Sequence, residues 1–219
     1  GVIVRMPVID DAARADLLRA IAAKYPGAEE LRYDSVGPSI GKELKSKAWS
    51  AIIATQILVM LYIAWAFRKV AGRIQAWKYG LLVIIAGLHD AIIPVGFFAI
   101  LGHFYGTEVG GAFIAAILTI LGYSINDTIV VFDRIRENIL RTEGTVAQVV
   151  TRSLNQVITR SINTTLTTLL ALSAVYLLGG ASTKDFALAL IVGIASGAYS
   201  SIFLASPLLV TWQKKSSAR

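Results

Sequence analysis

The chain has 219 residues, of which 55% are apolar and only 16% carry a charge. Soluble domains are about a quarter charged, so this composition predicts an integral membrane protein with a small polar segment. The chain has no cysteine, which excludes disulfides and thiolate metal sites. The net charge of +7 invites a nucleic-acid function. However, the basic residues lie at the ends of apolar runs, where membrane topology requires them, so no nucleic-acid partner is expected.

Residues 1–47 are more polar than the rest and predict a fragment of an α+β domain. Val2–Met6 alternates like a short strand, and Leu31–Val36 is spaced like a second one. Between them, Asp10–Lys24 carries its leucines and an isoleucine on one helical stripe, with an aspartate at its start as N-cap. A β-α-β unit of this size is too small to bury a sound core alone. We interpret it as the C-terminal part of a larger extracytoplasmic domain.

Five apolar runs reach the roughly 17–25 residues that a membrane-spanning helix needs. They are Trp49–Phe67, Tyr79–Leu101, Ala112–Phe132, Val157–Leu178 and Phe186–Trp212. They predict a membrane domain of five helices over residues 48–213, with a polar loop at 133–156 that holds short amphipathic helices. Residues 214–219 form a basic tail. The expected fold is a mainly α, polytopic membrane bundle with the partial α+β segment at its N-terminus.

The basic residues predict how these helices are oriented. They gather after the first run, after the third run and in the tail, whereas the other two loops together hold one lysine, Lys184. Basic loops face the cytoplasm by the positive-inside rule. The prediction is therefore an extracytoplasmic N-terminal segment, a cytoplasmic loop at 133–156 and a cytoplasmic tail.

Asp127 is an acid inside the third run, where a charge costs at least ~2.5–3.5 kcal/mol on insertion scales. Charges at this depth usually mark an ion or proton pathway. Asp127 shares one helix face with Tyr123, and Asn126 lies close to both. Counted from Arg134 at the cytoplasmic edge, Asp127 lies ~10 Å inward. The third run therefore predicts an acid that binds a transported proton.

The fourth run carries a second polar stripe, formed by Arg160, Asn163, Thr164 and Thr167. Because this run enters the membrane from the same side, Arg160 is expected at a depth comparable with that of Asp127. Opposite charges at one level on consecutive helices are expected to pair, which lowers the cost of both. Our hypothesis is that Asp127 is the protonation site and that Arg160 modulates it. The alternative is an ion pair that only fixes helix register.

Two further motifs stand out in the second and fifth runs. Asp90 is costly at mid-span, which favours a part in proton relay. The adjacent His89 points to a different helix face and could simply bond to the backbone. Gly193 and Gly197 form a GxxxG, which favours close helix packing. The sequence holds no phosphate loop, nucleophile elbow, zinc ligand set or calcium loop, so no metal or cofactor is expected and a soluble enzyme lacks support.

The run Gly122–Asn138 resembles the signature of the SecF family, the smaller subunit of the bacterial SecDF protein-export complex. Val36–Gly41, Leu88–Asp90 and Ser153–Thr164 resemble further motifs of this family, and the similarity covers nearly all of the membrane part. The resemblance implies membership of the resistance-nodulation-division superfamily. It also implies six spans, of which the five runs would be the second to the sixth, and a ferredoxin-like periplasmic domain.

The resemblance implies a non-enzymatic subunit that works with SecD in the bacterial cytoplasmic membrane. Such a subunit uses the proton-motive force to complete the movement of preproteins that emerge from the SecYEG channel. By motif match, Asp127 is the proton-carrying acid and Arg160 its partner, with Asp90, Asn126 and Thr128 as supporting positions. Two alternatives stay open, a small-molecule or lipid efflux half of the same superfamily and a non-catalytic scaffold. An efflux half would need a much larger extracytoplasmic region.

Overall fold

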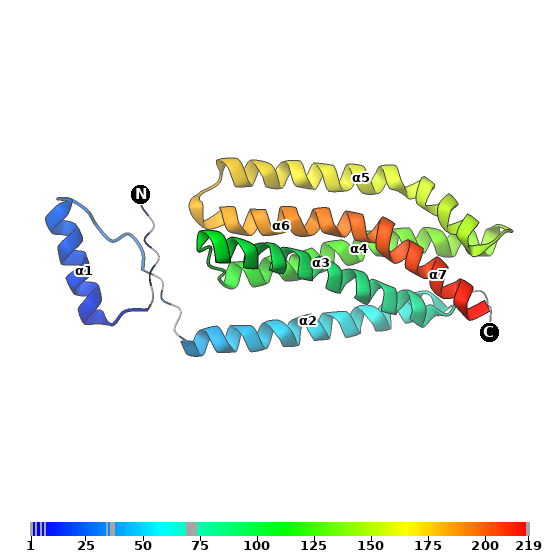
Figure 1. Ribbon diagram of the computed structural model, residues 1–219, viewed down its shortest axis with the longest axis horizontal. Helices are drawn as coiled ribbons and strands as arrows, with labels where there is room; N and C mark the ends of the chain where they lie inside the picture. Colours follow the sequence, from blue (N-terminus) through cyan, green and yellow to red (C-terminus); the bar gives the residue numbers. More distant parts are fainter. Residues whose placement is uncertain are drawn as a thin grey trace. The chain divides into compact units, whose positions relative to one another are not determined.

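The computed structural model describes residues 2, 4, 6, 8–33, 35, 38–68 and 74–217, without the side chains of 38–40, 181, 182 and 215–217. The chain divides into two compact units, Gly1–Ser50 and Ala51–Arg219. All regular structure in the described ranges is helical (Figure 1).

The first unit holds α1, Asp11–Lys24, and the beginning of α2. Asp10 caps α1, because its carboxylate accepts a hydrogen bond from the amide of Ala13 at 2.8 Å. No residue of α1 is buried. An ion pair between Arg14 and Glu30 ties this helix to the segment that follows it. The predicted N-terminal helix and its aspartate cap are thus confirmed.

The described residues of the first unit contain no strand, so the predicted α+β segment is not supported. The strands expected at Val2–Met6 and Leu31–Val36 lie partly outside the described residues, and their described residues are irregular. A strand obtains its backbone hydrogen bonds from a neighbour, and a pair of strands alone is marginal in water. Val2 and Leu31 are 91% and 89% exposed, so no apolar face of a sheet is buried at these positions.

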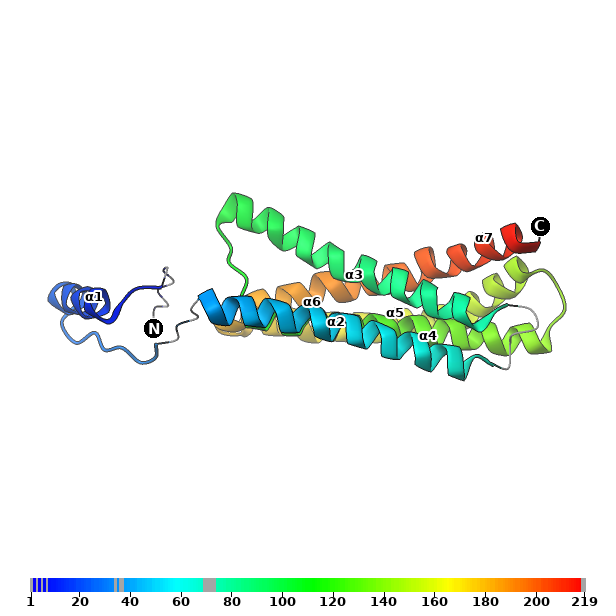
Figure 2. The same ribbon diagram turned by 90° about the horizontal axis from the view of Figure 1, so that it is seen from below.

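Five helical segments are long and apolar enough to cross a membrane. Four of them lie in α2 (Pro38–Ala66), α3 (Ala76–Tyr105), α4 (Gly111–Arg141) and α5 (Val146–Leu178). The fifth combines α6 (Ala181–Ser200), the π-helical turn η2 (Ser201–Ala205) and α7 (Ser206–Ser217). Figures 1 and 2 show α7 continuing the path of α6 without a reversal. The predicted polytopic helical bundle is therefore confirmed.

The third and fourth spans are longer than the apolar runs that predicted them. α4 continues to Arg141 and α5 begins at Val146, so most of the loop expected at 133–156 belongs to these two helices. The apolar run stops where charges begin, but a helix keeps its backbone hydrogen bonds in a polar setting. Pairs such as Arg136 with Asp133, 2.8 Å apart and three residues along the helix, support this extension.

α6 is the central helix of the second unit. It contacts α3, α4 and α5, and Figure 1 shows the orange α6 beside the yellow α5. Glycines permit its close approach to α4. A Cβ atom at Gly193 would lie 2.3 Å from Cδ1 of Ile120, and one at Gly197 would lie 3.0 Å from Cβ of Ser124. The two glycines of the GxxxG pattern therefore lie where the backbones of α4 and α6 come close.

α2 packs on the bundle by one side only. The ring centroid of Phe67, just beyond its end, lies 5.0 Å from that of Tyr79, and Tyr79 lies 5.2 Å from Phe132. Arg136 of α4 donates a hydrogen bond to the carbonyl of Ala66 at 3.1 Å. The other side of α2 carries exposed apolar residues, among them Ile57, Leu58, Leu61 and Trp65.

Candidate functional site

Asp127 lies near the middle of α4, at the contact with α5. Its side chain is half-buried, and its Oδ1 accepts a hydrogen bond from the hydroxyl of Ser161 at 2.9 Å. Its Oδ2 is buried and has no hydrogen-bond partner in the described part of the chain. The hydroxyl of Ser201 donates to the carbonyl of Gly197 at 2.9 Å and lies 2.8 Å from the hydroxyl of Thr128, the residue after Asp127. One oxygen of Asp127 is therefore available to bind a proton.

Arg160 does not pair with Asp127. It takes part in none of the ion pairs formed by the described side chains, and it is exposed. Consecutive residues of an α-helix point about 100° apart, and here Ser161 occupies the position that faces the acid. The ion pair expected from the sequence is not formed in this structure.

The other residues predicted beside Asp127 divide between the α4–α5 contact and the outer surface. Tyr123 donates a hydrogen bond to the carbonyl of Thr164 at 3.2 Å, and its hydroxyl lies 3.1 Å from that of Thr168. Asn126 and Asn163 are exposed. The structure thus brings Tyr123 to Thr164 but leaves the two asparagines on the surface.

A polar stripe on α5 is not covered by any described helix. It consists of the exposed residues Arg160, Asn163, Thr164 and Thr167. Charged side chains at membrane depth normally face a partner or a water-filled cavity rather than lipid. The α5 stripe therefore marks a side of the bundle that is unsuited to contact with lipid.

Asp90 forms a second polar cluster, between α3, α4 and α6. Its side chain is fully buried. It accepts hydrogen bonds from Ser196 at 3.1 Å, from Ser200 at 2.6 Å and from Ser124. Nδ1 of the neighbouring His89 lies 2.9 Å from its Oδ1. Four polar neighbours can satisfy most of the lone pairs of a carboxylate, so Asp90 is held far more completely than Asp127.

The π-helical turn η2 packs against α3 and α4, the helices that carry the two acids. Ser200, at the end of α6, donates to Asp90, whereas Ser201, at the start of η2, lies 2.8 Å from the hydroxyl of Thr128. The hydroxyl of Ser206 donates to the carbonyl of Ser201 at 3.0 Å. Short π-helical turns inside α-helices occur frequently at functional sites. Adjacent residues of the last span therefore contact the surroundings of both acids.

Sequence reasoning missed these serines and the π-helical turn. Serine is common in membrane helices, where its hydroxyl can bond to a carbonyl one turn earlier, so single serines attract no notice. A usable signal was the spacing of Ser196, Ser200 and Ser201 in a span that has no charge of its own at this depth. The residue composition of η2 does not predict its π-helical geometry.

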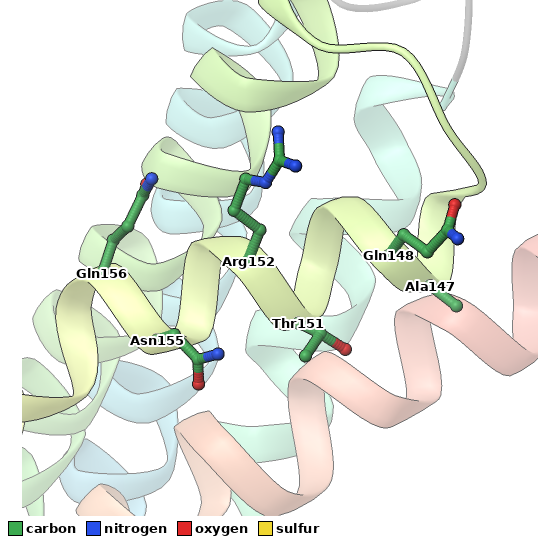
Figure 3. Close-up of a pocket in the computed structure, with 6 residues that line it drawn as sticks. All are labelled: Ala147, Gln148, Thr151, Arg152, Asn155 and Gln156. Carbon is green, nitrogen blue, oxygen red and sulfur yellow. The ribbon is translucent and has the colours of Figure 1, made fainter.

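A pocket of about 570 Å³ lies at the start of α5, apart from both acids. Figure 3 shows its lining side chains on successive turns of this helix, namely Ala147, Gln148, Thr151, Arg152, Asn155 and Gln156. The lining contains one charged residue, Arg152, and no acid or histidine. The pocket therefore adds no proton-binding group to the candidate site.

The chemistry that the two acid clusters support is proton exchange. Their hydrogen-bond partners are mainly hydroxyl groups, which can both donate and accept. No group of three or more histidine, aspartate or glutamate side chains gathers as a metal site within the described ranges. We therefore treat Asp127, Asp90 and the serines and threonine around them as one candidate site for protons.

Comparisons with known proteins agree with the motifs in the sequence. Residues 17–215 match the family described as protein export membrane protein SecD/SecF, C-terminal. The protein translocase subunit SecF of Thermobaculum terrenum is 46% identical over 222 residues, which cover 100% of this chain and 69% of that relative. The SecF subunit of Anaerolinea thermophila is 40% identical over 96% of this chain and 68% of its own length.

Two longer relatives are similar over almost all of this chain. The protein translocase subunit SecDF of Thermus thermophilus is 42% identical over 99% of the chain, which spans only 28% of that protein. The crystal structure of SecDF in its super-membrane-facing form matches with a TM-score of 0.76 at 39% identity, over 97% of this chain and 27% of that one. With its five apolar helices, the chain is a multi-pass membrane protein that belongs to the SecD/SecF family of protein-export membrane proteins.

Proposed function

We propose that this chain uses the proton-motive force to complete the translocation of preproteins that emerge from a SecYEG channel. The observation that carries the proposal is the carboxyl group of Asp127, which lies inside a span and has one buried oxygen without a hydrogen-bond partner. An ionisable group at this depth is a functional site by default, because its insertion cost is otherwise not offset. Because the chain belongs to a protein-export family, we infer that proton binding at this site drives protein translocation.

In this proposal, protonation of Asp127 causes α4 to move relative to α5. The ionised carboxylate holds Ser161 of α5 by a charge-assisted hydrogen bond. Protonation removes the charge and weakens that bond, so the two helices shift relative to each other. A ligand moves an equilibrium only by its different affinity for two states, and here the proton binds the state in which the α4–α5 contact is relaxed. Protonation from one side of the membrane and release to the other then give a cycle.

We assign the stripe on α5 to contact with a SecD subunit. The Thermus thermophilus relative is named SecDF, and this chain matches only 28% of it. A second membrane subunit would cover Arg160 and supply the polar partners that a charge at this depth requires. A cysteine at Asn163 should therefore cross-link to SecD in the assembled complex, whereas a cysteine at the exposed Ile92 of α3 should not. Equal cross-linking at the two positions would contradict this assignment.

The proposed orientation follows the basic residues. They gather at the cytoplasmic ends proposed for α4 and α5, with Arg134, Arg136, Arg141 and Arg152, and in the tail, and the positive-inside rule favours a cytoplasmic position for both regions in a bacterial cell. Five spans then put the N-terminal unit on the extracytoplasmic side, where a translocating preprotein emerges. Movement of the bundle would reach the preprotein through that unit.

Reconstitution with SecD and SecYEG in vesicles tests the proposed function. Preprotein that becomes protected from protease is measured with and without an imposed proton gradient. Asp127→Asn should abolish the stimulation by the gradient and leave gradient-independent translocation intact. Asp133→Asn is the matched control, because Asp133 lies on the same helix, is 55% exposed and pairs with Arg136. Normal stimulation in Asp127→Asn would refute the proposal, and a wild-type complex without stimulation would favour the scaffold.

A further inference from the structure

We propose that Asp90 is a second proton-binding carboxyl group of the same cycle, linked to Asp127 through the π-helical turn of the last span. The inference rests on the proposed proton-coupled function and adds a second site to it. Asp90 lies inside one chain, so its protonation does not need the partner that we assign to Arg160.

The first observation is the way Asp90 joins three helices. Its carboxyl group lies on α3 and binds Ser124 of α4 together with Ser196 and Ser200 of α6. All three contacts come from hydroxyl groups, which donate to a carboxylate and can turn to accept from a protonated carboxyl group. Both protonation states of Asp90 can thus be satisfied without a new partner. The change of state alters the hydrogen bonds of three helices at once.

The second observation is that the same two elements reach the surroundings of Asp127. On α4, the hydroxyl of Thr128 donates to the carbonyl of Ser124 at 3.1 Å and lies 2.8 Å from the hydroxyl of Ser201. Thr128 follows Asp127 directly in α4. A series of side-chain contacts that begins at Asp90 therefore reaches the residue next to Asp127.

The third observation is the geometry of η2. Ser200 and Ser201 are consecutive, yet one belongs to the end of α6 and the other to the π-helical turn. The carbonyl of Ser201 accepts from the hydroxyl of Ser206, five residues later, which supports the wider turn. In this proposal η2 changes between π-helical and α-helical form, which shifts the register of the residues that follow it. A change in the bond between Ser200 and Asp90 would bias that shift and move Ser201 against Thr128.

A proton can approach Asp90 through His89. The imidazole of His89 is 32% exposed, contacts the fully buried carboxyl group and stacks on the ring of Tyr199. Among titratable groups, His89 contacts Asp90 directly, and Tyr199 of α6 stacks on His89. α4 contributes Ser124 to this contact, and its acid Asp127 bonds to α5 instead. α6 contributes serines, and α2 contributes the uncharged Gln56, which lies against α3 one turn before Asp90. His89 is thus the group that connects Asp90 with the surface of the bundle.

Infrared difference spectroscopy of the complete complex across a pH series tests the inference directly, because protonated carboxyl groups give separate C=O bands. Wild type should show two bands that change with pH. Asp127→Asn should remove one band and displace the pH midpoint of the other, and Asp90→Asn should remove that other band. The displacement should correspond to a factor of about 5–150 in proton concentration, the usual range for coupled sites.

Ser201→Ala serves as the second variant, because it keeps both carboxyl groups and removes the contact with Thr128 together with a hydrogen bond to the carbonyl of Gly197 in its own span. It should displace the pH midpoint of both bands, whereas Ser173→Ala, a matched change on α5 outside both clusters, should displace neither. A wild-type spectrum identical to that of Asp90→Asn would overturn the second site. Unchanged midpoints in both Asp127→Asn and Ser201→Ala would overturn the link. These readouts do not depend on translocation, so failure of the proposed function is seen separately as absent stimulation by the gradient.

Discussion

Asp90 and Asp127 are acids in neighbouring spans of the same bundle, but they have opposite surroundings. Asp90 is fully buried and contacts three serine hydroxyls and His89. Asp127 is half-buried and has one oxygen without a hydrogen-bond partner. The hydrogen bonds of Asp90 are complete in the structure, whereas Asp127 has an oxygen that is open to a new partner. A charge at membrane depth is costly for either acid, so it is the surroundings that distinguish them.

The difference follows from the helices that each acid faces. Asp90 faces α6, where Gly193, Gly197 and the serines leave room for a close approach and supply donors. Asp127 faces α5, from which Ser161 donates a hydrogen bond to its carboxyl group, while the polar stripe of α5 is exposed. The Asp90 cluster is therefore complete within this chain, and we infer that the Asp127 site is completed by a partner subunit.

Alanine substitutions of the two acids should give the largest contrast in stability. Asp90→Ala takes this acceptor from three hydroxyls, those of the buried Ser124 and Ser200 and of the partly buried Ser196, so it should lower the free energy of unfolding by roughly 3 kcal/mol. Asp127→Ala loses one hydrogen bond and should cost about 1 kcal/mol. Unfolding of the purified chain by SDS in mixed micelles measures both values. Equal costs would show that the carboxyl group of Asp90 is not the main tie between the three helices.

A substitution at the contact between α4 and α6 should give the next largest effect on stability. Gly193→Ala places a Cβ atom 2.3 Å from the side chain of Ile120, so α4 and α6 must separate or Ile120 must leave its position. Overpacking of this kind should cost about 1–3 kcal/mol. Gly122→Ala on α4 is the control, because a Cβ atom there has nothing within 4 Å, and it should leave stability unchanged or slightly higher. The same SDS titration compares the two variants, and equal effects would contradict close packing at Gly193.

The sequence predicted the membrane bundle well because hydropathy and length dominate there. Five runs of spanning length correspond to the five long helices, since backbone groups in lipid must be satisfied within each helix. The helix ends were predicted less well, because ion pairs and a capping box at Thr145 extend α4 and α5 into polar sequence. Strand predictions at Val2–Met6 and Leu31–Val36 were not supported, because alternation specifies a strand only where a partner strand exists.

Within the candidate site, the sequence identified the charged residues that are costly to insert into a membrane, but not the residues that contact them. Asp127, Asp90 and Arg160 stand out as charges among apolar residues. Which residue faces an acid depends on a rotation of about 100° per position, and this decided that Ser161 rather than Arg160 contacts Asp127. The spacing of Ser196 and Ser200 could have marked a polar face, but not their contact with Asp90, because the register between α3 and α6 is set by packing and not by a local pattern.

Ser161→Ala tests the hydrogen bond between Asp127 and α5. The change removes the hydroxyl that donates to Oδ1 of Asp127 at 2.9 Å and fits the same buried space. It should lower stability by about 1 kcal/mol and weaken the stimulation of translocation by a proton gradient. Ser173→Ala on the same helix should change neither quantity. Full stimulation in Ser161→Ala would show that this hydrogen bond does not transmit the state of Asp127 to α5.

Arg160→Gln should have the smallest effect on the isolated chain and thereby separates the two explanations of this arginine. A structural ion pair with Asp127 would make its loss expensive, because an uncompensated buried charge would remain. In the structure Arg160 is exposed and Ser161 faces the acid, so the change should alter stability by less than ~0.5 kcal/mol.

In the assembled complex the same variant should lose gradient-stimulated translocation, because we place its partners on SecD. SDS unfolding of the chain alone and translocation by the complex are measured side by side. A large loss of stability in the chain alone would support an ion pair that fixes helix register. Full activity in the complex would show that Arg160 has no part in proton coupling.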